Sequence, residues 1–175
     1  VEFVLSAGPG GKGTVWLEDF RFEDRTCRKA PAVTVSKSAK GSDARSVLDK
    51  KGNTGWRSAQ GDTRPWLQLD FHQPREYGGL IIDWAPRPAK RAFEVQASED
   101  GAKWKTIHRS ASAEGARSFV YLPKGESRFL RLSFRGPAHI RQIEMQPFDF
   151  SRSEVDFFHA IAERSARGLN ARWLM

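Results

Sequence analysis

The sequence has little of what several protein classes require. It contains a single cysteine, Cys27, among 175 residues, so no intramolecular disulfide can form and one thiol does not make a metal site alone. A fold held together by disulfides is thereby excluded. The longest apolar stretch, residues 79–84, is far too short to cross a bilayer. The first residues also lack the basic start and long apolar core of a signal peptide.

Catalytic signatures are missing as well. There is no G-x-S-x-G motif, and the glycines of residues 8–13 have the wrong spacing for a phosphate-binding loop. The four histidines, His72, His108, His139 and His159, lie on different segments without the spacing of zinc ligands. We therefore expect neither an enzyme active site nor a zinc centre in this chain.

Positive charge is abundant but not concentrated. The formal net charge is +8, yet no segment has four consecutive basic residues, and acidic residues are interleaved with the basic ones. A nucleic-acid-binding chain gathers its lysines and arginines on one patch or stripe. The pattern therefore argues against nucleic acid as a partner and is compatible with an anionic polysaccharide or with simple solubility.

What the sequence does contain is a series of short strands. Hydrophobic residues make up 39% and aromatic residues 11%, as in a folded globular chain. Apolar and polar positions alternate over short segments separated by turn residues, and Asp100-Gly101 marks a hairpin. This arrangement predicts an all-β sandwich or barrel. The predicted strands are 14–22, 66–71, 79–84, 93–97, 104–108, 118–122, 128–134 and 139–148.

The two ends of the chain differ from this middle part. Residues 24–32 are polar and charged and contain a proline, which is typical of a linker. Near the other end, Ser151 and Glu154 have the spacing of a capping box, apolar residues follow at helical spacing, and Gly168 is a candidate helix stop. So much apolar surface requires a packing partner, which is either the sandwich or a further domain.

Six motifs occur in one order. They are VLDKKGNTGWRS, PWLQLDF, GLIID, FEVQASEDGAKWKTI, RFLRLSF and IRQIEM. Over residues 31–147 the sequence resembles the discoidin, or coagulation factor 5/8 type C, domain, a galactose-binding-like fold that includes family 32 carbohydrate-binding modules. The resemblance implies an all-β, discoidin-type jelly-roll β-sandwich, here with a C-terminal helix and an N-terminal strand segment from a neighbouring domain.

The resemblance also implies a division of the chain. Residues 1–24 look like the closing strands of a preceding β-domain, residues 25–30 are a linker, residues 31–148 form the sandwich, and residues 149–175 lead into a following helical domain. Such neighbours are similar to those in multidomain bacterial glycan-active proteins. We therefore expect a glycoside hydrolase or related enzyme as the parent protein, neighbouring domains as partners, and a periplasmic or secreted location.

In the family, a loop often holds a structural Ca²⁺ or Na⁺. The family pattern is an Asp, an oxygen ligand two residues on, a Thr five residues on and a Glu from the last strand. Asp49 and Thr54 match it, but Lys51 and Gln142 stand at the other two positions. Hard cations need several oxygen ligands, preferably anionic ones. We therefore expect no bound metal and no cofactor, with the Lys51 ammonium paired to Asp49.

The resemblance also suggests saccharide ligands. Family sugar binders carry a Pro-Arg pair after the central strand, which matches Arg87, and an Arg fork suits vicinal hydroxyls or a carboxylate. Lys90 and Arg91 stand where the family has an Asn, which favours an acidic sugar. His139 and Asp43 lie on two further loops and complete the predicted carbohydrate site. The alternative interpretation is a solvated basic loop.

Three tryptophans, Trp56, Trp66 and Trp104, could be taken for sugar-stacking platforms. In the family these positions pack the fold, and a buried tryptophan supplies a large apolar area. We therefore predict a structural role for all three.

Three functions remain open. The first is a non-catalytic carbohydrate-binding module that targets an attached glycan-processing enzyme to its polysaccharide or glycoconjugate substrate. The second is a spacer or docking domain that positions a catalytic neighbour and has no ligand of its own. The third, attachment to phospholipid headgroups, requires apolar loop tips that residues 38–43 and 86–91 do not offer, so we expect no membrane insertion.

Overall fold

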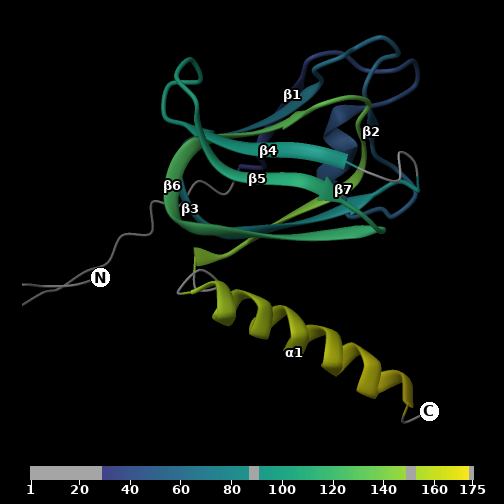
Figure 1. Cartoon of the computed structure of the whole chain (residues 1–175), viewed down its shortest axis with the longest axis vertical. Coiled ribbons are helices and arrows are strands. Elements are labelled where there is room, and N and C mark those ends of the chain that lie inside the picture. The colour runs from purple at the N-terminus through teal and green to yellow at the C-terminus, as the bar shows by residue number, and fades with distance from the viewer. Residues whose placement is uncertain (1–28, 87–90, 149–152, 174–175) are drawn as a thin grey trace, which may run out of the picture.

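The computed structural model describes residues 29–86, 91–148 and 153–173 (Figure 1). The predicted strand 14–22, the preceding β-domain and most of the linker lie outside these residues. The elements are β1 (Ala32–Val35), the 3-10 helix η1 (Ala44–Leu48), β2 (Trp56–Arg57), β3 (Trp66–Trp84), β4 (Arg91–Ser98), β5 (Lys105–Ala113), β6 (Arg117–Phe134), β7 (His139–Gln146) and α1 (Glu154–Trp173).

Two long, bent strands, β3 and β6, run through both layers of a sandwich (Figure 1). The first half of β3 pairs with the second half of β6, and the reverse holds for the other halves. The register shifts between Asp70 and Arg75 and between Tyr77 and Gly79, as expected where a bulge bends a strand. Continuous hydrogen bonding thus joins the two layers.

The strand order β2-β7-β3-β6-β4-β5, with β1 beside β3, assigns each strand to a layer. One layer contains β1, the first half of β3, the second half of β6, β4 and β5, and the other contains β2, β7 and the remaining halves. All these pairs are antiparallel. The predicted all-β sandwich with a C-terminal helix is therefore confirmed.

The core lies between the two layers and follows the alternation of the strands. Every second residue of β3 from Leu67 to Phe71 is buried, and so is every second residue from Leu80 to Trp84. The Trp84 ring lies 5.5 Å from the Phe93 ring and 6.2 Å from the Phe134 ring, measured between centroids. Each such side chain contributes about 1.5–3 kcal/mol through burial, so the sandwich has a core of its own.

The hairpin between β4 and β5 forms where Asp100-Gly101 predicts it. Gly101 has φ +73°, and Asp100 Oδ1 accepts hydrogen bonds from the backbone N–H groups of Ala102 and Lys103, both at 2.8 Å. An Asp side chain that bonds its own turn in this way is the usual reason for its preference there.

Helix α1 begins two residues later than the capping prediction required. The backbone N–H of Asp156 donates to Ser153 Oγ at 3.0 Å, and Ser153 Oγ bonds the Asp156 carboxylate at 2.8 Å. Ser153 is thus placed as the N-cap. The predicted cap, Ser151, lies outside the described residues. Gly168 does not stop the helix, which continues to Trp173.

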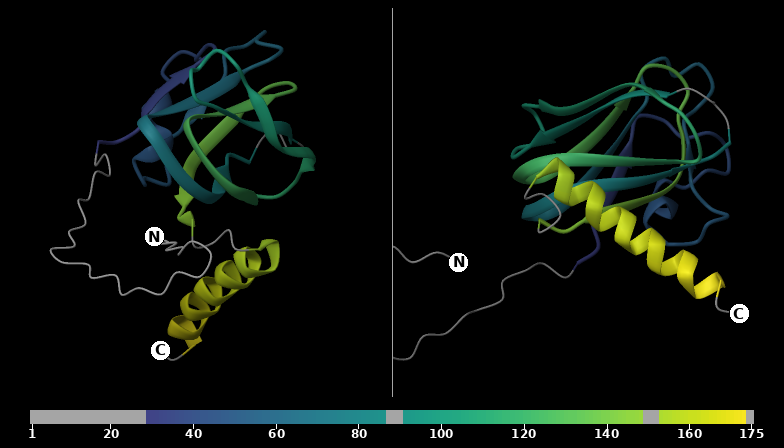
Figure 2. Two further views of the ribbon diagram at one scale, coloured as in Figure 1. Left: turned by 90° about the vertical axis from the view of Figure 1, so that its left-hand side faces the viewer. Right: turned by 60° about the horizontal axis from the view of Figure 1, so that its bottom comes forward.

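The helix docks on the outer face of the second layer. Phe157 is completely buried, and its ring centroid lies 5.8 Å from that of Tyr121 on β6. Arg164 donates to Gln146 Oε1 at 2.9 Å at the end of β7. Figure 2 shows α1 beside the sandwich in both views. The sequence left two possible packing partners for the apolar surface of this helix, the sandwich and a further domain. The structure shows that the helix packs on the sandwich.

Candidate functional site

Loops from four parts of the chain meet at the end of the sandwich where β7 begins. Ser42 Oγ accepts a hydrogen bond from the backbone N–H of Arg57 at 2.7 Å, which ties the turn before η1 to β2. Arg57 is the cross-strand partner of His139. The backbone N–H of Ala85, just after β3, donates to the carbonyl oxygen of His139 at 3.2 Å. We call this end, defined by Ser42, Asp43, Arg57, Ala85 and His139, the loop end.

His139 is partly buried at the loop end, and its surroundings are positive. Burial lowers the pKa of its imidazole from the ordinary 6.5, and the charges of Arg57, Arg141 and Arg91 lower this pKa further. The ring is therefore neutral at neutral pH and has one donor and one acceptor nitrogen. Such a group can form hydrogen bonds with a sugar hydroxyl in either direction.

Asp43 lies beside Ser42 and caps η1. Its Oδ1 accepts a hydrogen bond from the backbone N–H of Arg45 at 3.0 Å, and its side chain is exposed. A carboxylate has about four acceptor sites, so this cap leaves Asp43 with capacity for further hydrogen bonds. The structure thus brings two of the predicted sugar ligands, Asp43 and His139, to the same end of the sandwich.

Arg91 occupies a different kind of position from the one predicted. Only 5% of it is exposed, and its two terminal nitrogens donate to the carbonyl oxygens of Ala85, at 2.6 Å, and Gly115, at 3.0 Å. Its guanidinium also lies 5.0 Å from the Trp84 ring centroid. Arg91 therefore holds the chain that follows β3 in place rather than facing solvent. The other two predicted ligands of this loop, Arg87 and Lys90, lie outside the described residues.

The loop from Asp49 to Thr54 is closed by its own hydrogen bonds. The Thr54 hydroxyl lies 2.9 Å from both Asp49 carboxylate oxygens and 2.7 Å from the Lys51 carbonyl oxygen. The backbone N–H of Lys51, rather than its ammonium, donates to Asp49 Oδ1 at 2.8 Å. The predicted pairing of the ammonium with Asp49 was therefore wrong, since the backbone amide and the hydroxyl take its place.

Gln142 completes this loop in a way that does not suit a cation. Its amide nitrogen donates to the Val47 carbonyl oxygen at 2.9 Å, which leaves Gln142 Oε1 as the buried oxygen without a hydrogen-bond partner in the described loop. Of the side chains at the four family positions, only Asp49 is anionic, whereas Ca²⁺ takes six to eight oxygen ligands and prefers anionic ones. In the described ranges, no group of three or more His, Cys, Asp or Glu is placed to hold a metal ion. The residues present therefore do not fit the ion that the resemblance implies.

A comparison with family models matches residues 32–146 to the F5/8 type C domain. The chain belongs to this family. Its six sequence motifs and its bent-strand sandwich both fall within the matched residues. No curated protein matches the sequence.

Solved structures show the same fold. The module CpGH89CBM32-6 produced by Clostridium perfringens has a TM-score of 0.61 at 19% identity, over 69% of this chain and 95% of that one. Chitosan-binding module 2 of a chitosanase/glucanase from Paenibacillus sp. IK-5, in complex with chitotriose, has a TM-score of 0.60 at 17% identity, over 67% of this chain and 96% of that one. CpGH89CBM32-5 from Clostridium perfringens, in complex with GalNAc-beta-1,3-galactose, has a TM-score of 0.61 at 14% identity, over 66% of this chain and 94% of that one.

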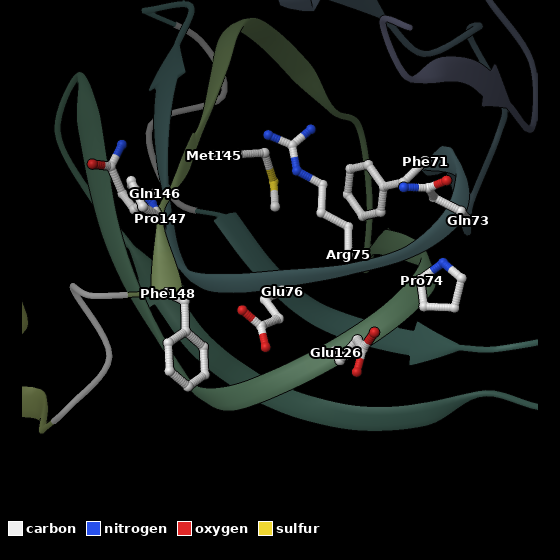
Figure 3. Close-up of a pocket in the computed structure, with 10 residues that line it drawn as sticks. All are labelled: Phe71, Gln73, Pro74, Arg75, Glu76, Glu126, Met145, Gln146, Pro147 and Phe148. Carbon is white, nitrogen blue, oxygen red and sulfur yellow. The ribbon is translucent and has the colours of Figure 1, made fainter. Parts of the chain in front are cut away.

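The F5/8 type C domain also has a hollow at the opposite end of β7, shown in Figure 3. Its volume is about 540 Å³, and it is lined where β3 bends and where β7 leads toward α1. Glu76 and Glu126, both in its lining, are cross-strand partners with like charges. The predicted sugar ligands that the structure describes, Asp43, Arg91 and His139, do not line it, so the hollow is separate from the loop end.

The predicted structural role of the tryptophans agrees with their positions in the F5/8 type C domain. Trp56 is completely buried. Trp66 and Trp104 are half-buried on the outer face, where the guanidinium of Arg131 lies 4.7 Å and 3.8 Å from their respective ring centroids. Arg131 also donates to Gln68 Oε1 at 2.8 Å. These two indole faces are thus occupied by Arg131.

Sequence reasoning missed a groove on this same outer face. Its volume is about 1060 Å³, and its lining includes Arg64, Arg109, Arg135 and Glu94. These residues come from the loop before β3, from β5, from the residue that follows β6 and from β4. Strand alternation predicts which of them point outward, but only the strand order brings them together.

Proposed function

We propose that this domain is a non-catalytic carbohydrate-binding module that targets an attached glycan-processing enzyme to its substrate. The saccharide binds at the loop end through a few directed hydrogen bonds. A shallow site of this kind has weak intrinsic affinity, and tethering to a catalytic domain raises the effective concentration of that domain at its substrate. A periplasmic or secreted location is part of the proposal, because that is where such polysaccharides are met.

The position of Asp43 and His139 on segments that are joined at the loop end, through Ser42 and Arg57, carries this proposal. Asp43 supplies an anionic acceptor, and the neutral imidazole of His139 supplies a donor and an acceptor. The relatives give further support, since one structure contains chitotriose and another contains GalNAc-beta-1,3-galactose. Arg87 follows the described part of the adjacent loop and stays a predicted ligand.

The test is a glycan array or affinity electrophoresis with neutral and uronic-acid polysaccharides. We expect His139→Ala and Arg87→Ala to abolish detectable binding to the neutral glycan that the unaltered protein retains. His159→Ala, which alters an exposed histidine on α1, is the matched control and keeps binding. Absence of binding across the whole panel overturns the proposal.

A second candidate function is a spacer that positions a neighbouring catalytic domain and has no ligand. The docked helix favours it, because Phe157 and Ile161 are both buried where α1 meets the sandwich. None of the described helices is long and apolar enough to span a membrane. A protein that fails the glycan panel but rigidly orients a fused neighbour, as seen by small-angle scattering, supports the spacer.

A further inference from the structure

The outer face of the first layer carries a row of side chains across four strands. Cross-strand pairing places Trp66 opposite Ser133, Ser133 opposite Glu94, and Glu94 opposite Arg109. Residues directly opposite each other on one face have Cβ atoms about 5 Å apart. The row therefore forms a continuous floor that crosses the strands. Together with Arg64 and Arg135 beside it, we call this feature the arginine groove.

The charges of the arginine groove are not balanced. Arg109 Nε and Arg135 Nη2 lie 3.7 Å and 3.8 Å from the same oxygen of Glu94. Both distances exceed those of a hydrogen bond, and the closer partner of Glu94 is the Thr106 hydroxyl at 3.2 Å. Arg64 adds a third arginine to the lining of the groove, in which Glu94 is the acidic residue that Arg109 and Arg135 approach.

The two paired arginines are not required by the fold. Their side chains are 71% and 81% exposed, and exposed ion pairs of this length contribute about 0–1 kcal/mol to stability. Their guanidinium groups reach the same oxygen, so one additional carboxylate can contact both. Planar guanidinium forks match carboxylates particularly well.

The chemistry of the floor favours a glycan over a nucleic acid. Glu94, Gln96 and Ser133 offer acceptors and donors for sugar hydroxyls. Base binding needs an open aromatic face, and Arg131 lies against the ring of Trp66. The volume of about 1060 Å³ is at the upper end of the range of ligand sites, enough for several sugar residues.

We propose that the arginine groove is a second binding site, separate from the loop end, and that it takes a carboxylate-bearing polysaccharide. A uronate carboxylate bridges Arg109 and Arg135, while Glu94 and Gln96 bond hydroxyls of the adjoining sugars. Arg64 contacts a further carboxylate along the chain.

The experiment measures polygalacturonate binding to the full chain by titration calorimetry. The double variant Arg109→Gln/Arg135→Gln is expected to weaken binding about tenfold or more, because two charge-assisted hydrogen-bonding groups are lost. The matched control, Arg75→Gln/Lys103→Gln, removes the same charge away from the groove and is expected to leave affinity within about twofold. Thermal unfolding of each variant verifies folding. Equal weakening in both variants, or no binding of polygalacturonate by the unaltered protein, overturns the proposal.

Two further arms identify the site and its ligand. Glu94→Gln removes the carboxylate that competes for Arg109 and Arg135 but keeps an amide that can still bond sugar hydroxyls, so it is expected to strengthen polygalacturonate binding. His159→Ala, which alters an exposed histidine on α1, leaves this binding unchanged. Loss with His139→Ala assigns this ligand to the loop end and overturns the second site. Fully methyl-esterified polygalacturonate, a sulfated glycan and single-stranded DNA are each expected to bind at least about tenfold more weakly. Equal or tighter binding of any of them overturns the assignment of a carboxylate ligand.

Discussion

A methyl group at position 79 would lie 2.4 Å from the Phe157 ring and 2.6 Å from the Val120 carbonyl oxygen. Glycine is therefore needed there for the helix to approach the sheet closely. We expect Gly79→Ala to lower the free energy of unfolding by about 1–3 kcal/mol, as overpacking does, in urea unfolding. Gly52→Ala, whose added methyl meets nothing within 4 Å, is the control. Equal effects of the two substitutions would contradict this account.

Two histidines make stability depend on pH. Burial lowers the pKa of His108 and of His139 from the ordinary 6.5. The unfolded chain then binds protons more readily than the folded one, so stability is complete above pH 6.5 and decreases as pH falls through that value. The slope is at most about 1.4 kcal/mol per pH unit and histidine.

Thermal unfolding between pH 8 and pH 5 tests this dependence. His108→Gln and His139→Gln are each expected to flatten the curve, and the double variant flattens it most. Asp70, whose pKa is lowered below 3.8 chiefly by the hydrogen bond from Arg128, affects stability only at lower pH. A protein that becomes more stable on acidification in this range would refute the assignment.

At the scale of single elements, Gln142 links η1 to β7 where the family has a cation ligand. We expect EDTA to leave the unfolding midpoint of the protein unchanged. Gln142→Glu places a carboxylate against the Val47 carbonyl oxygen, which should cost about 1–3 kcal/mol. Calcium is expected to restore part of this loss, because the new carboxylate joins Asp49 and Thr54 as a ligand. A midpoint that drops in EDTA without any substitution would show that the loop does hold a metal.

Helix α1 offers a matched pair of aromatic residues. Phe157 is completely buried against the sandwich, while its neighbour Phe158 is 44% exposed. Phe157→Ala should cost the docked helix about 3 kcal/mol or more and increase trypsin cleavage after Arg164. Phe158→Ala should leave the cleavage rate nearly unchanged. Similar rates for the two variants would mean that Phe157 does not hold the helix.

The strands show how far sequence patterns reach. Alternation located the segments 66–71, 79–84, 118–122 and 128–134, but each pair is one bent strand in the structure. The polar residues at each bend do not alternate with apolar ones, so the sequence does not identify them as strand. They are extended because they pair with the neighbouring strand. The Ser153 cap was missed for a related reason, because Ser151 and Ser153 are both followed by an acidic residue three positions on.

At the scale of the whole molecule, the family and the loop end could be predicted, while the arginine groove could not. Asp43 and His139 were predicted as sugar ligands through a resemblance in their loops, and that role stays a prediction. Arg91 was predicted as a surface donor because its burial depends on Ala85 and Gly115, two carbonyl partners that are distant in sequence from each other. A groove that crosses four strands is defined by the strand order, which local periodicity does not determine.

The two proposed sites should respond differently to salt, in a protein whose net charge is +8. Binding of polygalacturonate in the arginine groove depends on exposed charges, and it should weaken steadily between about 0.1 M and about 1 M NaCl as the screening length falls from about 10 Å to about 3 Å. Binding of a neutral oligosaccharide at the loop end depends on short hydrogen bonds and should change little. Affinity electrophoresis at several salt concentrations measures both. General attraction to the basic surface would also decline with salt, so the Arg109→Gln/Arg135→Gln variant is the control. We expect the affinity of this variant for polygalacturonate to depend much less on salt concentration. An unchanged salt dependence would mean that the whole surface, not the groove, attracts the polymer.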